Sequence, residues 1–229
     1  MVSESPSPDT KIRISYDHDN GTREEKADRD TIQLGAEYAF ARWISVEAAI
    51  PYTFLDPEDE SSRHDFDNIE VALKLASFHF EEKGLLLGGG LELGLPTGNG
   101  SKEIGSNHIV ELEPFISFGH KRGSLETVGV LALGFPRNRN GKDEADVEIG
   151  WNLSFLYHIT PEFQALLEFD GEEVDGGEED GTTIVNISPG FKMKPFANKN
   201  LEVGTSLSFP LSNDKEFHTR GLVSVFYHF

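Results

Sequence analysis

The stretch Val147-Glu148-Ile149-Gly150-Trp151-Asn152-Leu153-Ser154-Phe155-Leu156-Tyr157 decides the fold class. Apolar residues occupy its odd positions, and acidic, amide or small residues occupy most of its even positions. Successive side chains of a β-strand point to opposite faces, so this period of two predicts a strand with one apolar face. The same alternation recurs over residues 31–40, 44–54, 85–95, 185–193 and 201–211. Helical spacing is almost absent, and we expect an all-β chain.

Short and long polar connections alternate between these strands. The short ones lie near residues 41–42, 81–84, 120–123, 160–162 and 197–200, and the long ones near 18–29, 57–67, 98–107, 137–145, 171–181 and 212–216. This order predicts an up-and-down antiparallel barrel of about 12 strands, each about ten residues long. No composition shift marks a linker, so residues 1–229 are expected to form a single domain with a flexible N-terminal segment, 1–10.

Composition excludes several classes of protein. The chain of 229 residues has no cysteine, which rules out disulfides, thiol nucleophiles and thiolate metal sites. Its net charge of -20 argues against binding to nucleic acid, because phosphate neutralisation needs clustered Lys and Arg. No stretch approaches the roughly 18 consecutive apolar residues of a spanning helix.

The sense of the two strand faces favours a membrane barrel over a soluble one. In a membrane barrel the apolar face meets lipid and the polar face lines the lumen, with aromatic girdles at both interfaces. Aromatic residues concentrate near strand ends on the apolar face here. The expected membrane-interface residues are Trp43, Tyr52, Phe54, Tyr157, Phe163, Phe169, Phe191, Phe209, Tyr227 and Phe229, with Phe217 at the long-loop end. The alternative, a soluble barrel that carries a ligand, would place the apolar face inside.

Two stretches carry a family resemblance. The last strand, Val223-Ser224-Val225-Phe226-Tyr227-His228-Phe229, resembles the carboxyl-terminal assembly signal of bacterial outer-membrane barrels. Gly90-Leu91-Glu92-Leu93-Gly94-Leu95-Pro96-Thr97-Gly98 resembles the outer-membrane transporter family named for the meta-pathway of phenol degradation. That resemblance implies a small twelve-stranded channel for hydrophobic compounds. An acidic lumen, expected from the strand phases, departs from the implied cargo.

These resemblances imply a location and partners. The chain is expected in the cell outer membrane, in its mature form, since residues 1–9 hold no basic and apolar signal segment. Outer-membrane lipid and lipopolysaccharide would surround it, with long loops extracellular and short turns periplasmic. The barrel assembly machinery would recognise the strand that ends at Phe229. A monomer is expected.

The histidines give no sign of catalysis. The chain holds 8 of them, scattered over separate segments, and no His-x-Ser pair lies on one strand face. Metalloprotease, nucleophile-elbow and P-loop motifs are also absent. We therefore expect no enzyme activity and no required cofactor.

The polar strand faces supply the candidate functional residues. Taking the strand phases above, the lumen-lining residues are Glu37, Glu47, Glu70, Lys74, Glu92, Glu111, Glu113, Glu148, Asn152, Glu168, Lys192, Glu202 and Arg220. Acids outnumber bases in this set, which favours a channel for passive transport of small solutes with a preference for cations. The alternative is a plugged barrel, closed by ion-pair networks, that acts as a binding or structural protein with acidic, cation-binding loops.

Acidic residues that could bind cations and prolines within predicted strands are two further features of the sequence. Asp170, Glu172, Glu173 and Asp175 are candidate ligands for loosely bound Ca²⁺ or Mg²⁺, although their spacing fits no EF-hand loop.

Prolines interrupt several predicted strands, where each removes a ladder donor and predicts a bulge or a break in pairing. A break in the wall could give a lateral exit into the bilayer. These prolines are Pro51, Pro96, Pro114, Pro189 and Pro210.

Overall fold

The computed structural model describes residues 6–22, 27–58, 60–80, 84–138, 147–177, 180–195 and 200–229. Over these residues it holds twelve long strands, one short strand and one 3₁₀ turn. The elements are β1 (Lys11–Asn20), β2 (Ala27–Ala41), β3 (Ile44–Pro57), β4 (Arg63–Phe66), β5 (Ile69–Phe80), β6 (Leu85–Leu95), η2 (Gly100–Lys102), β7 (Ile109–Arg122), β8 (Leu125–Asn138), β9 (Val147–His158), β10 (Phe163–Asp175), β11 (Thr183–Met193), β12 (Leu201–Pro210) and β13 (Thr219–His228).

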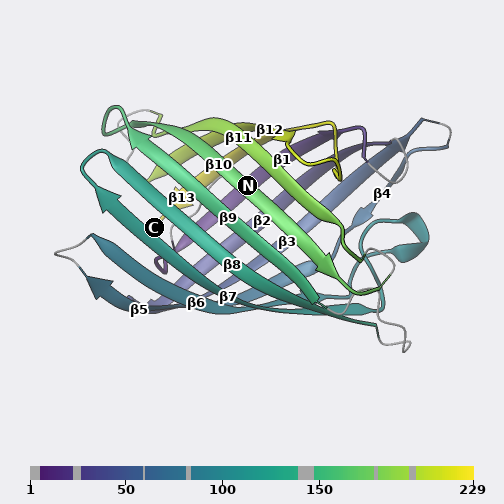
Figure 1. Ribbon diagram of the computed structural model, residues 1–229, viewed down its shortest axis with the longest axis horizontal. Helices are drawn as coiled ribbons and strands as arrows, with labels where there is room; N and C mark the ends of the chain where they lie inside the picture. Colours follow the sequence, from purple (N-terminus) through teal and green to yellow (C-terminus); the bar gives the residue numbers. More distant parts are fainter. Residues whose placement is uncertain are drawn as a thin grey trace.

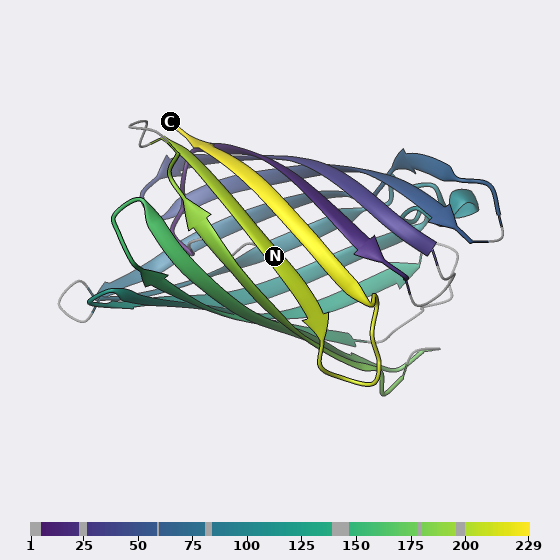
Figure 2. The same ribbon diagram turned by 90° about the horizontal axis from the view of Figure 1, so that it is seen from above.

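The long strands form one closed antiparallel barrel. Each pairs with its neighbours in sequence, and β1 pairs with β13 over ten residue pairs, from Lys11 with His228 to Asn20 with Thr219. The strands cross the barrel at a marked tilt in both views (Figure 1, Figure 2). The C-terminus lies at one end, and β4 and η2 lie at the other, where the long connections gather. The predicted fold class, an all-β meander closed into a barrel, is confirmed.

The two faces of the wall have the sense of a membrane barrel. Outward-facing apolar side chains are exposed around the whole circumference, for example Ile14 at 55%, Tyr38 at 58% and Leu207 at 58%. Inward-facing positions hold charged and hydroxyl side chains, and Glu168 and Ser154 are fully buried. Such an apolar exterior would be costly in water, and it matches the hydrocarbon of a bilayer. No helix among the described residues is long and apolar enough to cross a membrane.

The strands extend further than the sequence predicted. β1 continues to Asn20 and β2 begins at Ala27, so both reach into the expected loop 18–29. β2 has 15 residues rather than about ten, and β10 runs on to Asp175. Cross-strand hydrogen bonding propagates along a hairpin until a turn stops it, so polar residues near the tips were wrongly assigned to loops. Most of the expected loop 137–145 lies outside the described residues.

Proline interrupts the ladder at two places in mid-strand. Pairing of β7 with β8 lapses between Leu112 and Phe115, around Pro114. Pairing of β11 with β12 lapses between Ile187 and Gly190, around Pro189. Pro51 marks a different change, because β3 pairs with β5 only up to Ala49 and then pairs with β4. The expected local breaks are therefore present at these three prolines, and a lateral exit stays a prediction.

The expected girdle residues lie on the outer face, with one exception. Trp43, Tyr157 and Phe229 are more than half exposed, and the rings of Phe163 and Phe191 stack at 5.5 Å on adjacent strands. Phe217 does not belong to the girdle: it is 1% exposed, and the Arg220 guanidinium covers its ring at 4.3 Å. It lies in the connection between β12 and β13, where strand phase no longer decides which way a side chain points.

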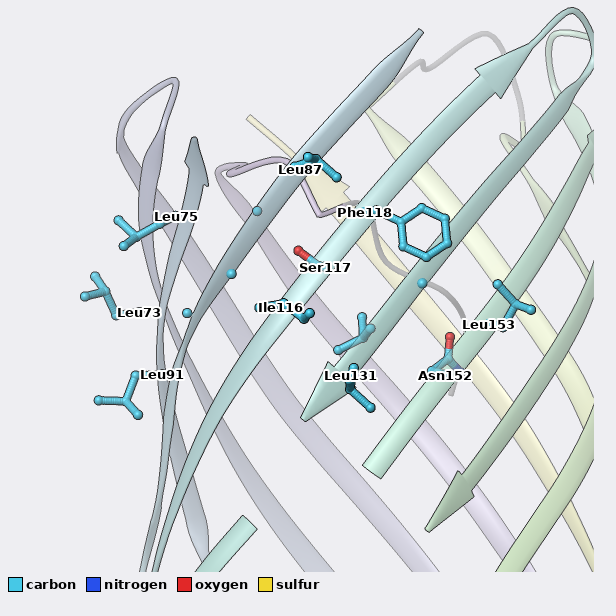
Figure 3. A pocket seen from close by; sticks show the side chains of 15 residues that line it. Leu73, Leu75, Leu87, Leu91, Ile116, Ser117, Phe118, Leu131, Asn152 and Leu153 are labelled. Carbon is cyan, nitrogen blue, oxygen red and sulfur yellow. The ribbon is translucent and has the colours of Figure 1, made fainter. Parts of the chain in front are cut away.

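A broad hollow marks the outer wall over β5 to β9. It is about 900 Å³ in volume and is centred on Gly88, Gly89 and Gly90 of β6, which leave this part of the wall without side chains. Leucines, an isoleucine and a phenylalanine surround it (Figure 3). Most of its lining is apolar and faces outward, so the hollow opens on the membrane-facing surface, whereas Ser117 and Asn152 at its floor come from the inner face.

Candidate permeation path

Three cavities follow one another through the lumen. The outer cavity, about 330 Å³, lies toward β4; the middle one is about 300 Å³; the inner one, about 170 Å³, lies toward the C-terminus. The outer and middle cavities share Glu70, Glu92 and Glu113 in their walls. The middle and inner cavities share only Val128. The candidate site is therefore a path along the barrel axis that narrows toward the short-turn end.

Four glutamates form what we call the carboxylate wall: Glu70, Glu92, Glu111 and Glu113. They project inward from β5, β6 and β7, and all four line the outer cavity. Glu92 and Glu113 are direct cross-strand neighbours, while Glu70 and Glu111 flank Gly94 on its two sides. In the described part of the chain, none of the four forms an ion pair with Lys or Arg. This wall gives the outer half of the lumen a concentrated negative charge.

Glycine allows the carboxylates to crowd together. A Cβ on Gly134 of β8 would lie 2.8 Å from Oε1 of Glu111 and 3.3 Å from Oε2 of Glu148. Both glutamate side chains therefore lie over this glycine, which extends the acidic surface from β7 to β9. The small residue on β8 is the local feature of the sequence that makes room for them.

An ion-pair network occupies the adjoining strands. Glu37 of β2 is 3% exposed and lies 3.2 Å from Nζ of Lys11 and 3.4 Å from Nζ of Lys74. Lys74 also pairs with Glu47, and the guanidinium of Arg13 lies 3.8 Å from Glu47. Ser45 donates a further hydrogen bond to Glu37 at 2.6 Å. Positive charge in this part of the lumen is thus matched by neighbouring carboxylates.

Small hydroxyl side chains line the opposite strands. Ser188 of β11 and Ser208 of β12 share a hydrogen bond at 2.6 Å. Ser154 of β9 donates to Glu168 of β10 at 3.1 Å. These short side chains are fully buried, with Ser154 and Ser188 at 0% exposure. Glu168 is fully buried here with Ser154 as a neutral partner.

Apolar side chains pack together where the middle and inner cavities meet at Val128. Val128 of β8, Leu156 of β9, Leu166 of β10 and Phe226 of β13 pack together at 2–4% exposure. We call this group the apolar cluster. The ammonium groups of Lys192 and Lys11 lie 5.2 and 5.9 Å from the centre of the Phe226 ring. Lys192 in turn pairs with Glu202 at 3.3 Å.

The segment 6–10 runs beside the apolar cluster. Pro6 lines the middle cavity against Gly119 of β7, and Asp9 lines the inner one. The carboxylate of Asp9 lies 2.6 Å from Nδ1 of His228, and its backbone N–H donates to Glu37 at 3.1 Å. These contacts place the described part of the N-terminal segment inside the lumen. Its expected flexibility stays a prediction.

Loops at the opposite end form a compact external cap from β4, η2 and the residues around them. Asp65 accepts hydrogen bonds from Lys102 at 2.9 Å, the Asn99 amide at 2.8 Å and the backbone N–H of Phe66 at 2.9 Å. These three donors, Lys102 first, lower the pKa of Asp65 to about 2. Arg63 pairs with Glu103 across the two loops at 2.6 Å. The cap borders the outer cavity through Asp67 and Asn68.

The structure places the predicted lumen residues on the inner face. Three of them are placed by single contacts: Glu148 lies beside Glu111, Glu168 is buried next to Ser154, and Arg220 binds Asp19. The others line the cavities or belong to the ion-pair network: Glu37, Glu47, Glu70, Lys74, Glu92, Glu111, Glu113, Asn152, Lys192 and Glu202. Sequence reasoning missed the apolar cluster and Asp9. A signal was present, because apolar runs such as Leu166-Leu167 and Val225-Phe226 break the alternation and put an apolar residue in the polar phase.

The four divalent-cation candidates are spread over two faces of β10. Asp170 faces inward and accepts a hydrogen bond from Asn186 at 2.8 Å, and Glu172 shares this phase. Glu173 and Asp175 are exposed on the opposite phase. No group of three His, Asp or Glu side chains arranged to hold a metal ion occurs within the described ranges. Loose Ca²⁺ or Mg²⁺ binding stays a prediction.

Comparison with known proteins gives similarity of fold. No family model matches the chain. No curated protein matches it either. Among solved structures, the COG4313 outer membrane channel from Pseudomonas putida F1 has a TM-score of 0.76 at 14% identity, covering 99% of this chain and 97% of that one. The KdgM porin has a TM-score of 0.62 at 13% identity, covering 96% and 99%. The NanC porin has a TM-score of 0.61 at 8% identity, covering 96% and 98%. The fold is therefore that of outer-membrane β-barrels.

Proposed function

We propose that this chain is an outer-membrane channel for passive transport of small solutes, with a preference for cations. The observation that carries the proposal is the outer cavity. Its wall holds the four glutamates of the carboxylate wall together with Asp67, and no Lys or Arg from the described residues. Carboxylates in a narrow lumen with a low-dielectric surround raise the local concentration of cations and exclude anions.

The exterior supports a membrane location. The apolar outer face would contact the lipid and lipopolysaccharide of the outer membrane, and acyl chains would fill the hollow at Gly88–Gly90. The twelve long strands close on one another, so the barrel of a monomer needs no partner strand. Assembly would use the last strand, which ends at Phe229.

The fold neighbours named as channels and porins add support for transport, and we propose no enzyme activity and no required cofactor. The family named for phenol degradation is not part of the proposal.

A second function has a specific observation in its favour. The apolar cluster and the segment 6–10 lie between the middle and inner cavities, as a plugged lumen would require. In that case the barrel would act as a binding or structural protein, and the acidic outer cavity would hold cations without passing them.

Conductance in a planar lipid bilayer tests the channel proposal. The purified full chain should give stepwise ion currents, and a KCl gradient should give a reversal potential of the sign expected for K⁺ permeation. The preference should shrink as salt rises but persist, because lumen charges are screened less than charges in open water. Anion selectivity would contradict the cation preference, and a silent barrel would favour the plugged alternative.

A further inference from the structure

The apolar cluster stands out because four large apolar side chains pack together, buried, on a face that is mostly polar. Most other inward positions hold Glu, Lys, Arg, Ser, Asn or small residues, and the large apolar side chains Phe115 and Val130 line the middle cavity. At the level of Leu156, Leu166 and Phe226, three strands place large apolar groups inside, and Val128 completes the group from a fourth. A residue facing lumen water gains nothing from being apolar, so these side chains must be packed against one another, and their 2–4% exposure agrees.

Phe226 reaches the cluster across small residues. In the sheet, Leu166 of β10 is followed across the strands by Gly190 of β11, Ser206 of β12 and Leu222 of β13. Glycine and serine leave a trough in the inner wall between β10 and β13. Leu222 packs on the cluster from the same strand as Phe226. The trough lets side chains three strands apart meet inside the barrel, so the cluster spans part of the lumen instead of lying flat on its wall.

Two lysines hold the Phe226 ring in this position. Their ammonium groups lie within 6 Å of the ring centre, the range of a cation–π interaction. Each lysine is also fixed by a carboxylate, Lys11 by Glu37 and Lys192 by Glu202. The ring of His228 stacks against Phe226 at 6.4 Å. Rotation of Phe226 out of the lumen would break all of these contacts.

We propose that the apolar cluster is the permeability barrier of this barrel and that Phe226 is the residue that limits how much current the path carries. This rests on the proposed channel function. Hydrated ions that enter the outer and middle cavities meet a dry constriction below Val128, and an apolar constriction excludes ions because they cannot keep their hydration there. The carboxylate wall sets which ions enter, and the cluster sets how many pass.

The test compares single-channel conductance of full-length variants in planar bilayers. Phe226→Ala should raise the conductance at least about threefold over the unchanged protein, because it removes the ring that spans the trough. Leu166→Ala, on a strand far from the C-terminus, should raise it in the same direction even if Phe226→Ala assembles poorly. Val225→Ala is the matched control, since it removes an outward-facing side chain from the same strand. Both opened variants should keep the cation preference.

Different outcomes separate this proposal from the channel function. If the unchanged protein and all variants conduct equally, the cluster is not the barrier, and the channel function stands. If removal of residues 2–8 raises conductance while Phe226→Ala and Leu166→Ala do not, the N-terminal segment is the seal and the proposal is wrong. If no variant conducts at all, both the barrier and the channel function are contradicted.

Discussion

Glu92 on β6 and Glu113 on β7 are direct cross-strand partners, and both carboxylates face the same cavity. Like charges at directly opposed positions of an antiparallel pair destabilise the sheet. The barrel nevertheless carries this pair, with two more glutamates on the neighbouring row. Such an arrangement costs stability, and it agrees with the cation preference proposed above.

The first prediction follows from that cost. Glu113→Gln should stabilise the barrel by about 0.5 kcal/mol, because it removes the repulsion from Glu92 while keeping size and hydrogen-bonding capacity. Resistance to thermal unfolding in detergent, followed by heat-modifiable gel mobility, measures this. Glu173→Gln, at an exposed outward position, is the control and should leave the transition unchanged. A lower transition for Glu113→Gln would show that this carboxylate is satisfied by a favourable contact.

The second prediction concerns selectivity. Glu111→Gln combined with Glu113→Gln should shift the reversal potential in a KCl gradient toward zero, because it removes two of the four charges of the carboxylate wall. Neutralising Glu173 and Asp175, which lie exposed on the outside of β10, should shift it less, and the difference should grow with salt. Glu178 and Glu179, in the same acidic loop, lie outside the described residues and are expected to behave like this control. Equal effects of the inner and outer pairs would contradict a selectivity site in the lumen.

The third prediction concerns the seam that closes the barrel. Arg220 of β13 binds Asp19 of β1 through two hydrogen bonds, at 2.5 and 2.8 Å. Arg220→Ala should destabilise the barrel by about 2 kcal/mol, since it leaves the Asp19 carboxylate, 9% exposed, without its partner. Gel mobility after graded heating measures the loss. The double variant Arg220→Ala with Asp19→Asn should recover part of it, and no recovery would show that Arg220 acts by covering Phe217.

The fourth prediction concerns acid. The pKa of Asp65 is lowered to about 2 in the folded cap, so its contribution to cap stability is complete above its ordinary value near 3.8 and is lost as pH falls toward 2. Hydrogen exchange at the backbone of residues 97–108 should therefore be slow at pH 6 and become faster, after correction for the intrinsic rate, between pH 4 and pH 2. Asp65→Asn should give the faster exchange already at pH 6. Unchanged protection across this range would exclude Asp65 as the group that joins the two loops.

The fifth prediction concerns assembly. Removal of Phe229 should lower the amount of folded barrel in the outer membrane of cells, because the residue directly follows the closing strand β13 and its backbone N–H donates a hydrogen bond to the carbonyl of Thr10 at 3.0 Å. Surface labelling of intact cells measures the amount. Phe229→Tyr keeps an aromatic end and should assemble normally. Unchanged surface levels after the removal would show that the last strand is recognised without its terminal aromatic residue.

Alternation alone determined the strands, their faces and the meander order. The period of two fixes which side chains lie together on one face, as it does in residues 147–157. In other strands the same period assigned the glutamates at 92, 111 and 113 to the inside. This works because strand geometry is local: the direction of a side chain depends only on its position along its own strand. The ends of strands were predicted less well, because polar residues at hairpin tips can either pair or turn.

Only the tertiary structure decided which inward residues meet. The pattern places Phe226 inside without saying that it reaches Leu166 three strands away, because that contact depends on the curvature of the closed wall and on the small residues at 190 and 206. It likewise leaves open that Asp9 lies against His228, since closure of β1 on β13 brings together residues more than 200 positions apart. The sequence by itself determined a membrane-type barrel with an acidic inner face. The contacts across its lumen depend on distances that no period along the chain encodes.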